Sequence, residues 1–212
     1  MAAFLANIRA VAWAGVVLAL LFFLIYAMGV RNFSFQDPVF WEAGLRWAHV
    51  LSGIMWIGLL YYFNFVQAPN VTKIPEEHRG PAIGKVITPA ALFWFRWAAM
   101  STIAFGVALA GEKGYLFSAY TLGLYTPADG GVDPNFARFI GLGMWLATIM
   151  WFNVWFIIWP NQQRALNIDN KFPDLAPEAK AAAAKTASQF SRINTLLSIP
   201  MLVAMTGAQT LG

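Results

Sequence analysis

Apolar residues in this chain gather into five long runs, separated by shorter stretches that hold most of the polar residues. The runs cover residues of about 10–30, 42–67, 89–111, 138–160 and 193–211. A helix needs roughly 20 mostly apolar residues to cross the hydrocarbon core of a bilayer, so each run is long enough for one crossing. The pattern predicts an all-α integral membrane bundle of five transmembrane helices, formed by one domain that covers residues 1–212.

Composition and charge agree with a membrane protein. Hydrophobic residues make up 59% of the chain and charged residues 11%, whereas soluble domains carry about 25% charge. The formal charge of +4 is explained by topology, so it does not indicate nucleic acid. The chain has no cysteine, which excludes disulfides, thiolate zinc sites, iron-sulfur clusters and covalent c-type haem. A redox cofactor would therefore have to be held without a covalent bond.

The basic residues of the connecting stretches predict the orientation. One side would carry Arg9, Lys73, Arg79, Lys85, Arg164, Lys171, Lys180, Lys185 and Arg192, and the other Arg31, Arg46, Lys113 and Arg138. The positive-inside rule makes the richer side cytoplasmic. The N-terminus is then predicted to be cytoplasmic and the C-terminus to lie outside.

The second run carries a polar stripe. As a helix it would place Arg46, His49, Ser52, Gly53 and Trp56 on one face, because residues three, four and seven apart lie along the same side. His49 is the only histidine in an apolar run; the other, His78, lies among loop charges and is expected to be a surface residue. An ionisable side chain in a membrane helix is by default a functional hypothesis.

Two interpretations of His49 stay open. A neutral imidazole can be the axial ligand of a haem iron, with Gly53 leaving room for the porphyrin edge, Arg46 pairing with a propionate and Trp56 forming an apolar wall. His49 would then be the metal ligand. Alternatively, His49 forms a hydrogen bond to a neighbouring helix, which is common in membrane bundles.

A second axial ligand is harder to find, since no other histidine lies in an apolar run. Met144 and Met205 are expected at a depth similar to that of His49, so either would complete a His/Met haem. Methionine in such helices usually serves packing. Five-coordinate haem, a ligand from a partner, and no haem at all remain open.

A second group of polar side chains is expected near the cytoplasmic ends of four helices. Arg96, Asn64 and Asn153 are the candidate substrate-binding residues, because amides and a guanidinium match the polar edges of a planar molecule. Their neighbours would be Gln67, Asn161, Arg192 and Asn194. The alternatives are interhelical hydrogen bonds for the amides and snorkelling to the headgroups for Arg96.

Several segments resemble a known family. WAHVLSGIMWIGLLYYFNFVQAP (47–69), LFWFRWAA (92–99), MWFNVWFIIWPNQ (150–162) and SRINTLLSIPMLVAM (191–205) are similar to the N-terminal membrane domain of bacterial urate hydroxylases, the urate oxidase N-terminal family. The second run is also similar, more distantly, to membrane haem proteins of the protoporphyrinogen oxidase type. There, the histidine of an H-x-x-x-G-x-x-W pattern is implicated in haem binding; here it corresponds to His49, with Gly53 and Trp56.

The resemblance implies a bacterial inner-membrane location, oxidation of a purine such as urate, and electron transfer to cytochrome c. The c-type cytochrome domain usually joined to this membrane domain is absent from the sequence, which has no CxxCH motif. The leading hypothesis is therefore a redox protein that binds b-type haem and passes electrons to a separate c-type cytochrome. A non-catalytic accessory subunit of a larger membrane complex and a protein that oxidises urate directly are the alternatives.

Overall fold

The structure is a computed structural model, and it describes residues 2–125, 127 and 131–211. These residues form helices, turns and connecting segments, with no β-strand among them. By its internal contacts the chain divides into two compact units, Met1–Trp47 and Ala48–Gly212. The single transmembrane domain expected from the sequence stays a prediction. Residues 126 and 128–130, which lie between the third and fourth apolar runs, are outside the described ranges.

The first unit contains α1 (Ala2–Leu5), α2 (Ile8–Leu24), the π-helical turn η1 (Ile25–Val30) and the beginning of α3 (Pro38–Tyr61). Helix α2 begins where the Asn7 side-chain oxygen accepts the N–H groups of Arg9 and Ala10, which have no partner within the helix. None of its residues is buried within the structure. Within this unit α2 therefore leaves apolar side chains exposed along its length.

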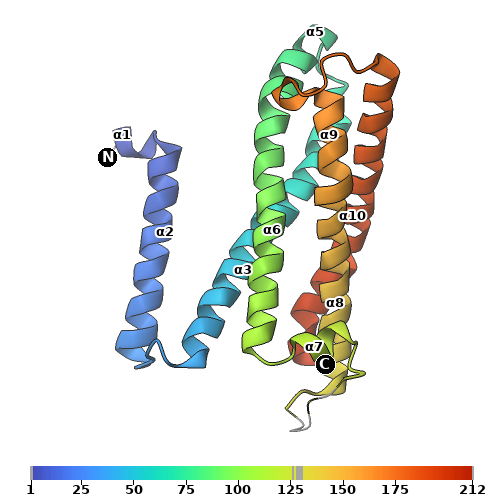
Figure 1. Ribbon diagram of the computed structural model, residues 1–212. Helices are drawn as coiled ribbons and strands as arrows, with labels where there is room; N and C mark the ends of the chain where they lie inside the picture. The colour runs from blue at the N-terminus through green and yellow to red at the C-terminus, as the bar shows by residue number, and fades with distance from the viewer. Residues whose placement is uncertain (1, 126, 128–130, 212) are drawn as a thin grey trace. The chain divides into compact units, whose positions relative to one another are not determined.

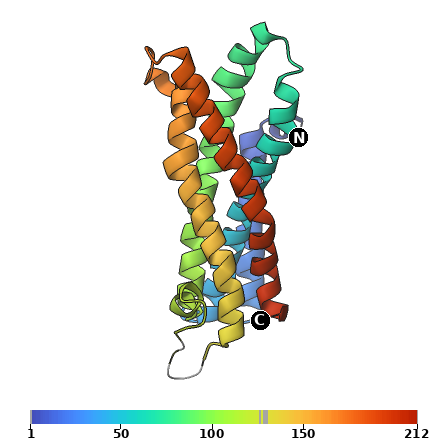
Figure 2. The same cartoon turned by 90° about the vertical axis from the view of Figure 1, so that its right-hand side faces the viewer.

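The second unit holds the remainder of α3 and all later elements. These are η2 (Tyr62–Gln67), α4 (Ala68–Val71), α5 (Glu76–His78), η3 (Arg79–Ile87), α6 (Thr88–Glu112), α7 (Leu116–Tyr120), α8 (Pro134–Phe152), η4 (Asn153–Ile158), α9 (Trp159–Leu166), η5 (Ile168–Asn170) and α10 (Pro177–Leu211). In both views α10 runs beside the continuous helix formed by α8, η4 and α9 (Figures 1 and 2). The part of α3 in this unit runs obliquely to α6 (Figure 1).

Three π-helical turns let the helices of this unit continue past prolines, so these helices are longer than expected. The π-helical turns η2, η3 and η4 each end two residues before a proline: Pro69, Pro89 and Pro160. A proline has no N–H and its ring clashes with the carbonyl four residues earlier, whereas a π turn moves that carbonyl away. The helix of the fourth apolar run, expected to cover about 138–160, therefore continues through Pro160 and ends at Leu166.

In the part of the chain that the structure describes, four helical segments are long and apolar enough to cross a membrane: Ile8–Val30, Pro38–Val71, Glu76–Glu112 and Pro134–Leu166. The chain is therefore a membrane protein with an all-helical fold. The fifth predicted crossing, in α10, is absent from this set; the apolar half of this helix also holds the polar residues Asn194, Ser198 and Gln209. The predicted fifth crossing and the sides of the two termini stay predictions.

Candidate functional site

His49 lies on α3 at the point where this helix meets α6. Its Nδ1 is 2.8 Å from the main-chain oxygen of Thr102. A carbonyl oxygen only accepts hydrogen bonds, so Nδ1 carries the proton and donates it. The other ring nitrogen, Nε2, is then left with a lone pair, which is the form that binds a metal. His49 is partly buried.

Gly106 makes this hydrogen bond possible. In a helix the Thr102 carbonyl already accepts the N–H of residue 106, and its second lone pair is reached only past the side chain at that position. A Cβ on Gly106 would lie 2.8 Å from the His49 Cε1 atom and 2.9 Å from its Nδ1. These separations are shorter than carbon contacts allow. Glycine is therefore required for the imidazole to lie against the backbone of α6.

Gly53 lies one turn along α3 from His49 and faces the same helix. A Cβ at this position would come within 3.9 Å of the Thr102 Cγ2 atom. On α6, Ala98, Thr102 and Gly106 follow one another at every fourth position, the spacing that lets membrane helices approach closely. Gly53 thus faces the side chain of Thr102 at this crossing.

The other residues expected around a haem have different surroundings. Trp56 is fully buried in the core of the second unit, and no described residue accepts its indole N–H. Met144 packs among Ala110, Ala119, Ile140 and Ala208. Arg46 is exposed, one turn before His49 on α3. The structure joins His49 and Gly53 to Thr102, and it places Met144 in a separate cluster.

The imidazole itself fits a haem ligand. Histidines that bind metals almost always donate their second ring N–H to a carboxylate or carbonyl, which fixes the tautomer and the orientation of the ring. The bond from His49 to Thr102 has this form. The described residues contain no group of three histidine, cysteine, aspartate or glutamate side chains that would hold a metal ion. Among the described residues, the donor at this place is thus the single imidazole of His49.

The amides form a second feature, which we call the amide cluster: Asn64, Asn153, Ser191 and Asn194. The Asn153 Nδ2 donates to the Asn194 Oδ1 at 2.8 Å, and the Asn194 Nδ2 donates to the main-chain oxygen of Met150 at 2.9 Å. Both asparagines are buried. The Asn64 Nδ2 donates to the Leu60 carbonyl at 2.9 Å and to the Ser191 Oγ at 2.8 Å. These bonds connect α10 with α8 and with η2, the continuation of α3.

Two of the π-helical turns present the amides to α10. Asn64 lies within η2, and Asn153 is the first residue of η4. A π turn inserts one extra residue and so rotates the following side chains around the helix axis. As a result both asparagines donate to neighbouring groups of the bundle, which is the interhelical hydrogen bonding weighed from the sequence. Gln67, also in η2, donates to the Thr88 hydroxyl at 2.9 Å.

Arg96 lies apart from these amides, against tryptophan rings. Its Cζ atom is 3.8 Å from the ring centroid of Trp159, 5.4 Å from that of Trp155 and 5.9 Å from that of Trp97. We call these four residues the arginine–tryptophan cluster. The Arg96 Nε is buried without an acceptor. Three residues were expected to bind a substrate: Arg96, Asn64 and Asn153. In the structure each of them has different partners.

Residues 132–209 match the family described as urate oxidase N-terminal. This finding confirms the family resemblance for the segment from α8 to α10. The match includes Met144, Asn153 and Asn194 and leaves out His49, Asn64 and Arg96. No curated protein and no solved structure matches the chain.

The sequence interpretation did not identify several residues that the structure places at these sites. Gly106 and Thr102 position His49, and Trp155 and Trp159 surround Arg96. The spacing of Ala98, Thr102 and Gly106 would have indicated a close helix approach on α6. The sequence could not identify the Thr102 acceptor, because it is a main-chain carbonyl and every residue has one.

Proposed function

We propose that this chain is a membrane redox protein similar to the membrane domain of urate hydroxylases, which binds haem b through His49 and passes electrons to a separate c-type cytochrome. The family match at residues 132–209 supports the membrane-domain part of this proposal. The observation that supports the haem part is the bond from His49 Nδ1 to the Thr102 carbonyl. It prepares Nε2 as an iron ligand.

The chain's own residues have distinct roles in this proposal. Thr102 and Gly106 hold the imidazole in one orientation, so that no rotation has to be restricted when iron binds. Arg46, one turn away on α3, supplies a positive charge for a propionate, and buried Trp56 keeps water from the inner side of α3. The haem, when bound, takes up and releases one electron at a time.

The substrate of this proposal comes from the family resemblance. A purine such as urate is what the family resemblance implies, with Arg96, Asn64 and Asn153 as the expected binding residues. The amide donors of Asn64 and Asn153 are already used within the bundle. The haem proposal does not depend on where the substrate binds.

The visible absorption spectrum of the purified protein tests this proposal. We expect a Soret band in the wild type and its loss in His49→Ala. His78→Ala is the matched control, because His78 is exposed and lies beside Glu77 at 3.4 Å, and it should keep the band. A folded wild type without a Soret band, or an unchanged band in His49→Ala, would refute haem binding at His49. Stoichiometric co-purification with a larger complex would then favour the accessory subunit.

A further inference from the structure

Arg96 is a cation in a membrane helix whose contacts are with aromatic ring faces. The guanidinium lies over Trp159, with Trp155 and Trp97 beside it. A cation is attracted to the face of an indole ring, by about 2 kcal/mol when water is excluded. Ring faces stabilise the charge, but they do not accept the N–H groups that point outward in the guanidinium plane. Among the described residues, neither the buried Nε of Arg96 nor the buried Nε1 of Trp155 has an acceptor.

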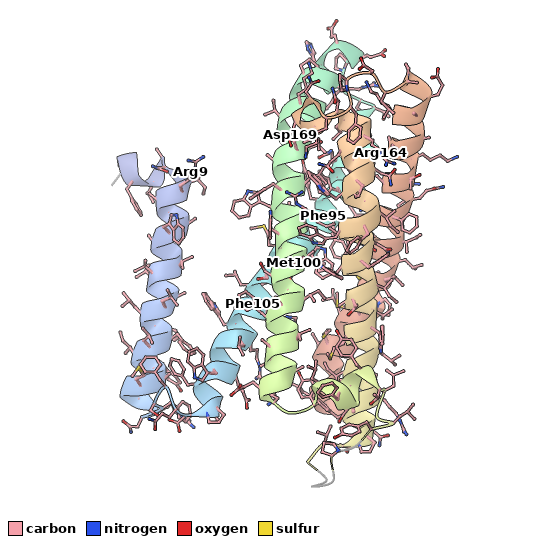
Figure 3. All side chains as sticks on the ribbon, in the orientation of Figure 1. Arg9, Phe95, Met100, Phe105, Arg164 and Asp169 are labelled. Carbon is pink, nitrogen blue, oxygen red and sulfur yellow. The ribbon has the colours of Figure 1, made fainter. Side chains whose placement is uncertain are left out.

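The carboxylate of Asp169 lies in this region, but it does not accept the N–H groups of Arg96. Asp169, which follows α9, interacts with Arg96 only through space. Its carboxylate lies 3.9 Å from the Lys171 ammonium, and the two form the ion pair. Figure 3 shows Asp169 at the end of the bundle where Arg164 lies. The terminal Nη groups of Arg96 therefore have no carboxylate partner among the described residues and are available to another anion.

The depth of Arg96 indicates what kind of anion can reach it. Sixteen residues separate Arg96 from Glu112, the last residue of α6, which is about 24 Å along a helix. The hydrocarbon core is about 30 Å thick. If Glu112 is at one membrane surface, Arg96 lies within about 6 Å of the opposite headgroups. Tryptophans are enriched at this level in membrane proteins, in agreement with the three rings around Arg96.

We propose that the arginine–tryptophan cluster binds the phosphate of an anionic phospholipid headgroup in the leaflet at the α9 end of the bundle. The planar guanidinium presents paired N–H groups that match two phosphate oxygens, and its stacking on Trp159 fixes their direction. This inference goes beyond the proposed function and does not depend on haem binding. A free phosphate ion has the same chemistry and is the alternative source.

Thermal unfolding in lipid nanodiscs tests the site. In phosphatidylcholine discs, adding phosphatidylglycerol should raise the Tm of the wild type, and the lipid fraction that gives half of this rise should increase about tenfold or more in Arg96→Gln. Arg192→Gln is the matched control, because Arg192 is an exposed arginine on α10, and it should respond as the wild type does. An equal response of the wild type and Arg96→Gln would overturn the proposal.

A second arm separates the two sources of phosphate. Inorganic phosphate is titrated in discs of phosphatidylcholine alone. A rise in Tm with phosphate but none with phosphatidylglycerol would overturn the lipid assignment in favour of a free oxyanion. If Arg96→Gln does not fold, Arg96→Lys replaces it, since lysine keeps the charge but loses the planar pair of donors. Native mass spectrometry of the wild type provides the independent measurement, and no retained anionic lipid would count against the site.

Discussion

At the scale of single residues, the position of His49 depends on Gly106, which has no Cβ atom. The Thr102 carbonyl has two lone pairs, and the helix uses one of them. Gly106 leaves the other accessible, and the imidazole occupies the space where a Cβ would be. A histidine placed in this way has one tautomer and one orientation, which are requirements for a ligand and are not needed for simple packing.

Replacing Gly106 with alanine should disturb His49 directly. The new Cβ would lie 2.8 Å from the Cε1 atom, so the ring must move and its bond to Thr102 must lengthen or break. The chain has two histidines, so ¹⁵N labelling of histidine gives two ring systems, and His49→Ala assigns them. We expect a protonated Nδ1 at His49 in the wild type and a changed signal in Gly106→Ala.

Gly111→Ala is the control for this experiment. Gly111 lies on the same helix, and nothing comes within 4 Å of the position that a Cβ would take there. This variant should keep both the ¹⁵N signals and any Soret band of the wild type. If Gly106→Ala and Gly111→Ala give the same spectra, the close contact between His49 and α6 is wrong.

A second residue-scale prediction concerns Asp37, in the turn before α3. The main-chain N–H and then the hydroxyl of Ser34 donate to its carboxylate, and they lower the pKa of Asp37 below its ordinary value. The turn is therefore stabilised above pH of about 4, and this contribution is lost as the pH falls through the lowered pKa. Ser34→Ala should raise the pKa of Asp37, measured by NMR titration of the carboxyl carbon; no change would contradict the role of the hydroxyl.

At the scale of helices, the amide cluster fixes the register between α10 and its neighbours. Asn153 and Asn194 are buried and hydrogen-bonded to each other, and the hydroxyl of Tyr61 on α3 lies 3.0 Å from the Ser198 hydroxyl. A one-turn slip of α10 would leave these polar groups without partners in a region of low dielectric. The polar residues of α10 thus specify which face of the helix points inward.

Removing one amide should therefore destabilise the bundle. We expect Asn194→Ala to lower the free energy of unfolding by about 1–3 kcal/mol, because the Asn153 donor and the Met150 carbonyl lose their partner. Unfolding in SDS measures the change. Asn161→Ala is the control, since the Asn161 amide bonds to Ile157 within its own helix, and it should cost less. In a double-mutant cycle, a coupling near zero between Asn153 and Asn194 would contradict this assignment.

The sequence was informative about helices and less so about their ends and partners. Apolar runs predicted the membrane helices, and the i, i+3, i+4 spacing around His49 identified one face of α3. The helix ends differ because Pro69, Pro89 and Pro160 are accommodated by π turns, which hydropathy does not detect. The contacts of His49 and Arg96 depend on the register between distant helices. No single helix sequence contains that information.

At the scale of the whole molecule, α10 shows the distribution of residues that a membrane imposes. Its buried residues include the polar Asn194 and Ser198, both fully buried, while Leu196 and Ile199 are 70% and 59% exposed. In water this arrangement would be unfavourable, whereas in lipid it satisfies both groups. An average over the helix does not detect this distribution, because Asn194 and Ser198 lower the hydropathy although both are buried. This distribution supports a fifth crossing in the second half of α10.

Cysteine labelling can decide the fifth crossing, since the chain has no cysteine of its own. We consider Glu178→Cys and Thr210→Cys, two exposed positions near the two ends of α10. Thirty-two residues separate them, about 48 Å along a helix and more than the hydrocarbon thickness of about 30 Å.

If α10 crosses the membrane, an impermeant maleimide should label Thr210→Cys on intact cells and Glu178→Cys only after permeabilisation. Leu124, between α7 and α8, is 87% exposed, and Leu124→Cys should be labelled under the same conditions as Thr210→Cys. Equal labelling of both α10 positions would show that α10 does not cross the membrane. The basic residues after α9 and the C-terminus would then lie on the same side of the membrane.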